Sequence, residues 1–204
     1  MRKLIVPAFI SLDGVMQAPG GPEEDTSEGF AHGGWVWPYY DDSDGEMGGV
    51  FKRPFELLLG RRTYDIFAGY WPHVAEDAPH RNIADMFNGT AKHVATHRPD
   101  TLAWNNSRAL GPDIAAAVRE LKRGDGPDLL TQGSSELVHQ LLATDLVDEL
   151  RLLVFPVLLG RGKRLFDDRA QASAFRLEAS KASSKGVLTN RYVRAGEVRT
   201  GSFE

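Results

Sequence analysis

The chain has 204 residues, a length that suits one domain with a core large enough to need no cross-link. It contains no cysteine, which excludes disulfides, a thiolate nucleophile and cysteine-ligated metal centres, and which fits a cytoplasmic location. Its 24 basic and 28 acidic side chains are interspersed and give a net charge of −4, so no basic stripe predicts nucleic-acid binding. No apolar run approaches the ~20 residues of a membrane span. We therefore expect residues 1–204 to form a single domain that acts on a small molecule.

The first half of the chain alternates short apolar runs with helical patterns. Residues 4–10 predict a buried strand, and the run is too short to be a signal peptide. The glycine- and proline-rich residues 17–34 predict a long loop of the kind that often forms a lid or a binding loop. The elements expected next are a weak helix over 39–52, a strand over 55–59, helices over 63–71 and 83–87, a strand over 92–96 and a shorter one over 102–105.

The second half of the chain continues the alternation of helices and strands and ends in a predicted β-hairpin. Ile114, Val118 and Leu121 share one face of a helix expected over 112–123, which Gly124 ends. A strand over 128–131, a helix over 134–142 and a strand over 149–157 follow. Alternating residues from 175 to 180, a turn at 184–186 and a strand over 187–194 predict a final hairpin. The order predicts an α/β fold, with a mainly parallel sheet, helices on both faces and an antiparallel edge.

One candidate site follows the apolar run of residues 57–59. Gly60 ends the run, Arg61 and Arg62 come next, and Thr63 is placed to cap the following helix. Unpaired N–H groups and a partial positive charge at a helix start favour an anion, and arginine adds donors suited to phosphate oxygens. Phosphate binding and a plain strand–turn–helix with solvated arginines both fit these residues.

A second candidate site follows residues 129–131. Gln132 leads into Gly133, Ser134 and Ser135 at the start of the next helix. Glycine permits close approach of a pyrophosphate, and serine hydroxyls can contact it or cap the helix. Both glycines are expected at the carboxyl edge of the sheet, where open parallel sheets bind their ligands. Neither site has the spacing of a dinucleotide-binding GxGxxG motif or of a Walker A loop.

Four segments together resemble the dihydrofolate reductase superfamily, and most of all its riboflavin-biosynthesis reductase branch. They span nearly the whole chain in the family's order: Phe9-Ile10-Ser11-Leu12-Asp13-Gly14, then Leu59-Gly60-Arg61-Arg62-Thr63-Tyr64, then Gln132-Gly133-Ser134, then Asp148-Glu149-Leu150 through Phe155-Pro156-Val157-Leu158-Leu159-Gly160-Arg161-Gly162 to Leu165-Phe166. The resemblance implies a dihydrofolate-reductase-like three-layer fold and NADPH as cofactor.

The resemblance also implies roles for individual residues. Ser11, Asp13 and Gly14 would lie near the nicotinamide. The 2′-phosphate and pyrophosphate would be held after the second strand by Gly60, Arg61, Arg62 and Thr63, and after the later one by Gly133, Ser134 and Ser135. Thr96, His97 and Arg98 would flank the adenosine end.

The substrate side is carried by fewer residues. Asp44 lies 16 residues before Gly60, about where the family places an acid that binds the pterin and assists protonation. Asp41, Asp42 and Glu46 are rival acids, and a solvated helix start explains all four. The sequence around Asp44 is otherwise unlike a folate-binding helix, which argues against dihydrofolate as substrate.

These observations predict an NADPH-dependent reductase of a pteridine- or pyrimidine-like molecule. Two alternatives stay open: a reductase acting on the ribosylaminopyrimidine of riboflavin synthesis, and a non-catalytic nucleotide-binding protein of the same fold. No metal site is expected, because His93 and His97 flank a strand and are separated by roughly 13 Å. A homodimer is expected, because riboflavin-type reductases commonly pair through the late strand and hairpin, and exposed sheet edges are usually covered.

Overall fold

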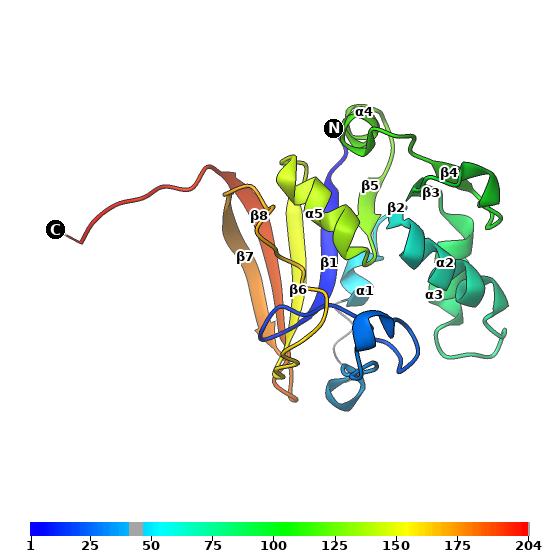
Figure 1. The fold of residues 1–204 in the computed structure, drawn as a ribbon, viewed down its shortest axis with the longest axis horizontal. Helices are drawn as coiled ribbons and strands as arrows, with labels where there is room; N and C mark the ends of the chain where they lie inside the picture. Colours follow the sequence, from blue (N-terminus) through cyan, green and yellow to red (C-terminus); the bar gives the residue numbers. More distant parts are fainter. Residues whose placement is uncertain (41–46, 204) are drawn as a thin grey trace.

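A computed structural model of the chain describes residues 1–40 and 47–203 (Figure 1). Within these residues eight strands form one sheet in the order β4-β3-β2-β5-β1-β6-β8-β7. The six strands from β4 to β6 are parallel, and β8 runs antiparallel to both β6 and β7. The strands are β1 (Leu4–Ser11), β2 (Phe55–Gly60), β3 (Lys92–Ala95), β4 (Ser107–Ala109), β5 (Asp128–Thr131), β6 (Glu149–Phe155), β7 (Ala174–Ala182) and β8 (Leu188–Gly196).

Helices cover both faces of the sheet. Alternate residues of β1 point to opposite faces, so Leu4 and Val6 pack with α4 and α5, whereas Ile5 packs with α1, α2 and α3. The result is the three-layer fold that the sequence predicted. The helices are α1 (Met47–Val50), α2 (Arg61–Tyr70), α3 (Arg81–Gly89), α4 (Ile114–Arg123) and α5 (Ser135–Ala143), and the 3-10 helices are η1 (Ser27–Gly29), η2 (Trp37–Tyr39), η4 (Trp71–His73) and η5 (Pro99–Thr101).

The short strand, the weak helix and the start of α2 differ from the prediction, and α3, α4 and β6 each shift by two residues at one or both ends. The short strand lies at Ser107–Ala109, and not over residues 102–105. Trp104 is buried there instead, and its indole donates to Asn88 Oδ1 at 2.8 Å, so this segment contributes a side chain to the core and forms no strand. The helix expected over 39–52 is only Met47–Val50 in its described part, because Tyr40 is already extended with ψ of 132°. Helix α2 begins at Arg61, two residues before the predicted start.

The strand order positions the candidate site. Strand β5 lies between β1 and β2 and is parallel to both. The segments that follow β1, β2 and β5 therefore leave the sheet side by side at its carboxyl edge. Gly60 and Gly133, far apart in sequence, become neighbours for this reason.

The hairpin end of the sheet is more open. Strand β7 is an edge strand with mostly exposed side chains, and Leu177 is half-exposed. Beyond Gly196 the chain runs away from the sheet (Figure 1). The homodimer stays a prediction. No helix among residues 1–40 and 47–203 has the length and apolar character needed to cross a bilayer.

Candidate functional site

The turns after β2 and β5 interlock. The Gly60 N–H donates to Ser134 Oγ at 2.8 Å, and the Ser134 hydroxyl donates to Thr63 Oγ1 at 2.6 Å. A Cβ at Gly60 would lie 2.7 Å from the Ser134 side chain, so only glycine allows this approach. Gly133 and Ser134 both have left-handed backbone, with φ of 73° and 67°. The strain at Ser134 is offset by the contacts that its hydroxyl makes.

These turns bring two helix N-termini to the same place. Gly60 is the N-cap of α2 and Ser134 is the N-cap of α5, and neither caps its own helix with a side chain. Thr63 was expected to cap α2, which is wrong: it is the third residue of that helix, and its hydroxyl contacts Ser134. The first-turn N–H groups of both helices have no intrahelical acceptor, which makes this edge suitable for an anion.

Two buried polar atoms beside the turns are unpaired. Thr131 Oγ1, at the end of β5, and Gln132 Nε2 have no hydrogen-bond partner among the described residues. Buried polar groups are almost always paired, so each unpaired atom calls for a ligand or a water. A dinucleotide with phosphate and amide groups fits a site that combines such atoms with two open helix starts.

Arg61 joins α2 to the loop after β3. Its Nε donates to Asp65 at 2.8 Å, and its Nη1 donates to Thr101 Oγ1 at 2.6 Å and to the Arg98 carbonyl at 3.2 Å. Thr96 Oγ1 is a weaker acceptor at 3.4 Å. The structure thus brings Arg61, Thr96 and Arg98 together, and their role at the adenosine end of a cofactor stays a prediction. His97 is exposed in the same loop.

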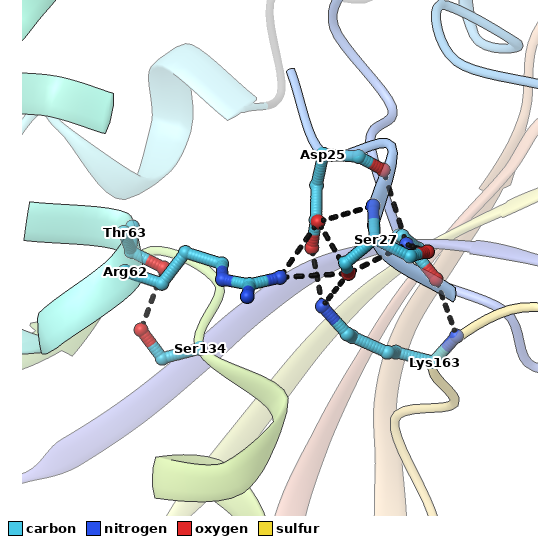
Figure 2. Close-up of polar contacts among 7 residues, drawn as sticks. Asp25, Ser27, Arg62, Thr63, Ser134 and Lys163 are labelled. Atoms are coloured by element: carbon cyan, nitrogen blue, oxygen red, sulfur yellow. Dashed lines mark hydrogen bonds and ion pairs between the residues drawn. The ribbon is translucent and has the colours of Figure 1, made fainter. Parts of the chain in front are cut away.

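Arg62 turns the other way, toward the loop of residues 17–34. Its Nη1 donates to Asp25 Oδ1 at 2.8 Å and to Ser27 Oγ at 2.7 Å. Figure 2 shows Lys163 reaching the same two residues from the loop after β6. Partial burial pushes the pKa of Asp25 upward, but hydrogen bonds from Lys163 and Ser27 outweigh it and lower the pKa to about 2.

The turn after β1 is occupied by internal contacts. The Asp13 carboxylate accepts from the Ser11 hydroxyl at 2.6 Å and from the N–H groups of Leu159 and Gly160 at 3.1 and 2.8 Å. Burial acts to raise the pKa of Asp13, but these hydrogen bonds lower it overall. Gly14 has φ of 81°, as this tight turn requires. Ser11, Asp13 and Gly14 thus fasten β1 to the loop after β6.

Two predicted site residues, Asp44 and Ser135, remain to be placed. Asp44, the predicted catalytic acid, lies outside the described residues. Ser135 begins α5 and is half-buried beside the interlocked turns. The residues that sequence reasoning missed are Asp25, Ser27 and Lys163; the loop of 17–34 was singled out as a binding loop, but no spacing connects it to residue 163.

No metal site is found in the part of the chain that the structure describes. His93 is buried within β3, and its Nε2 lies 2.7 Å from Glu56 Oε2, which explains it as a core residue. His139, in α5, contacts the Arg164 carbonyl and Arg169 and lies 3.0 Å from Asp167. These histidines are held by the protein itself.

These features define an open α/β fold in which two glycine turns and two helix N-termini meet at the carboxyl edge of the sheet. Comparison with known proteins agrees: the RibD C-terminal domain family model matches residues 2–189. The chain belongs to the RibD C-terminal domain family. Its relatives include YyaP of Bacillus subtilis (strain 168), which is 24% identical over 187 residues, covering 92% of both chains.

Solved structures support the fold. A riboflavin-biosynthesis-like protein from Shewanella sp. PV-4 matches with a TM-score of 0.67 and 19% identity, over 95% of this chain and 99% of that one. Dihydrofolate reductase from Enterococcus faecalis, solved with NADP(H), matches with a TM-score of 0.59 and 15% identity, over 94% and 96%. The likeness to both proteins confirms the predicted dihydrofolate-reductase-like architecture.

Proposed function

We propose that the protein is an NADPH-dependent reductase of a small pteridine- or pyrimidine-like molecule. The observation that carries the proposal is the interlocking of the Gly60 and Ser134 turns, which directs two helix N-termini to one point. A pyrophosphate is the cofactor group that such an arrangement suits best. Membership in a reductase family supports the same conclusion.

The residues around the turns would divide the cofactor between them. Gly133, Ser134 and the start of α5 would hold the pyrophosphate. Arg61 and Arg62 would hold the 2′-phosphate, because two arginines exceed what a pyrophosphate needs when backbone N–H groups already bind it. Bound NADPH supplies the hydride, and the protein supplies position and electrostatics.

The substrate would lie on the side of the site nearest the turn after β1. Trp35 is buried there against Phe155, with ring centroids 5.3 Å apart, and its indole donates to the Gln17 carbonyl at 2.8 Å. Both rings belong to a buried core cluster, so they support this edge of the sheet from within. Asp44 remains the proposed proton donor. The family match favours a second candidate, the reduction of a ribosylaminopyrimidine of the riboflavin type.

Calorimetric titration with NADPH and NADH tests the cofactor assignment without a known substrate. The wild-type protein should bind NADPH at least about tenfold more tightly, because a charge-assisted contact to the 2′-phosphate contributes ~1.5–3 kcal/mol. Arg61→Ala or Arg62→Ala should remove most of that preference and leave NADH binding nearly unchanged.

Arg81→Ala is the matched control, because Arg81 also pairs with an aspartate one helical turn away, but on α3. It should leave both affinities unchanged. Equal affinities for the two cofactors in the wild-type protein would overturn the NADPH assignment. Binding of NADPH with no oxidation by any pteridine or pyrimidine would favour a non-catalytic nucleotide-binding protein.

A further inference from the structure

We infer that Arg62, Lys163 and Ser27 form a phosphate-binding cradle that the chain's own Asp25 occupies in this structure. A ligand phosphate would bind there by displacing the Asp25 carboxylate. The inference rests in part on the proposed function, because the cofactor is one source of such a phosphate. A phosphorylated substrate is the other.

The geometry of the cradle is that of an anion site. Arg62 Nη1 and Lys163 Nζ both donate to the Asp25 carboxylate, on Oδ1 and Oδ2 respectively. Both cations also donate to Ser27 Oγ, at 2.7 and 2.8 Å, and the Ser27 hydroxyl donates to Asp25 Oδ1 at 2.6 Å. Three elements distant in sequence thus direct their donors at one carboxylate (Figure 2).

The charges in the cradle do not balance. Two cations face one carboxylate, which leaves an excess of one positive charge. A phosphate monoester carries nearly two negative charges and three strong acceptor oxygens, so it matches two cations and a hydroxyl better than a carboxylate does. Asp25 competes because it is tethered beside the cations, and not because it is the better ligand.

The cradle is open to a ligand. The Arg62 side chain is 59% exposed, whereas Asp25 is 13% exposed beneath it. Gln17 Nε2 donates to the backbone carbonyls of Asp25 and Ser27 at 3.0 and 3.1 Å, which holds the loop in place independently of the Asp25 carboxylate. Rotation of one side chain would therefore free both cations, with the loop still attached.

The cradle also lies next to the interlocked turns. Arg62 is the second residue of α2 and directly precedes Thr63, which contacts Ser134. Figure 2 shows the Thr63–Ser134 contact on one side of Arg62 and the Asp25 cluster on the other. A dinucleotide whose pyrophosphate binds at the turns can place its other phosphate in the cradle. A phosphorylated substrate that lies over β1 can do the same.

The test measures affinities of Asp25→Asn for NADPH, NADH and ribose 5-phosphate by calorimetry at low salt. Removing the internal competitor should tighten binding of a phosphate ligand about three- to tenfold. Asp85→Asn is the control, because it removes the same charge from an ion pair on α3. It should change no affinity. Lys163→Met removes one cation and should weaken binding of the same ligand.

The three ligands distinguish the source of the phosphate. A gain confined to NADPH identifies the 2′-phosphate, an equal gain for NADPH and NADH identifies the pyrophosphate, and a gain for ribose 5-phosphate alone identifies the substrate. Each of these supports the cradle. The inference is overturned if Asp25→Asn tightens none of the three, or if Lys163→Met weakens none.

The outcome is separable from that of the proposed function. Wild-type protein that binds neither dinucleotide refutes the NADPH assignment, while ribose 5-phosphate still reports on the cradle. NADPH binding that is strong and unchanged in Asp25→Asn refutes only the cradle. Thermal unfolding of each variant shows that it is folded, and Lys163→Met provides a test should Asp25→Asn fail to fold.

Discussion

The turn after β1 and the paired turns after β2 and β5 occupy the same edge of the sheet and contain similar residues. They differ in where their polar atoms are directed. At the first turn the Ser11 hydroxyl and the Asp13 carboxylate are bound by groups of the protein itself. At the paired turns, Thr131 Oγ1 and Gln132 Nε2 are buried and have no partner within the described residues. Turns of similar composition at this edge therefore differ in their hydrogen bonding: the first is closed by the protein itself, and the paired turns leave polar atoms open.

Among the variants, a substitution of Gly60 should have the largest effect on the paired turns. In Gly60→Ala the new Cβ would lie 2.7 Å from the Ser134 side chain and force the two turns apart. We expect NADPH affinity to fall by more than about tenfold and the free energy of unfolding to fall by about 1–3 kcal/mol. Gly60 has an ordinary φ of −76°, so backbone strain does not contribute.

Gly69→Ala is the matched control for Gly60→Ala. It lies in the same helix, and an added Cβ there meets no atom within 4 Å. Calorimetry and thermal unfolding should show unchanged NADPH binding and unchanged or slightly higher stability. A Gly60→Ala protein that binds NADPH normally would show that the turns do not need to interlock.

Asp13→Asn, in the turn after β1, should lower stability and leave cofactor binding intact. The charged acceptor of two N–H groups and one hydroxyl is replaced by an amide that accepts at one atom only. The free energy of unfolding, measured by denaturant titration, should fall by about 2 kcal/mol. The affinity for NADPH should not change, and a lost NADPH affinity in a folded variant would place Asp13 in the cofactor site.

Asp25 should make the smallest contribution to the free energy of unfolding, and this contribution should depend on pH. Its pKa of about 2 in the folded protein lies below the ordinary value of 3.8. The stabilisation is therefore complete above pH 3.8 and is lost as the pH falls toward 2, by about 1–2 kcal/mol. The charged groups that face Asp25 are Arg62 and Lys163.

Chemical unfolding at pH 5 and at pH 2.5 checks this prediction. The wild-type protein should lose more stability between the two values than Asp25→Asn does. The same loss in both proteins would mean that Asp25 does not stabilise the loop through its charge.

The sequence predicted the fold well because the signals are local. Buried strands are apolar runs, helix α4 has its apolar residues on one face, and Gly60, Gly124 and Gly186 mark ends and turns. The errors occurred where tertiary contacts decide. Trp104 lies in a short, mostly apolar segment that resembles a strand, but the Tyr64 hydroxyl accepts from its backbone N–H at 2.9 Å and holds it in the core.

The site was predicted less completely than the fold. The glycine turns were found, because strand–glycine–helix is a local pattern. The opposite directions of Arg61 and Arg62 were not, since they depend on partners distant in sequence, such as Arg98 and Asp25, each 37 residues away. The contact of Lys163 with Asp25 spans 138 residues and has no signature in sequence spacing.

The position of β5 between β1 and β2 has a consequence for folding. The two strands that emerge first cannot pair with each other, because their shared neighbour begins only at Asp128. A nascent chain that ends before this residue presents both edges of β1 and one edge of β2 unpaired, which invites intermolecular pairing. Closing the centre of the sheet also requires loop closure over most of the chain, which is typical of slow folding. The arrangement that joins Gly60 to Ser134 thus ties the formation of this edge of the sheet to the synthesis of β5 and the start of α5.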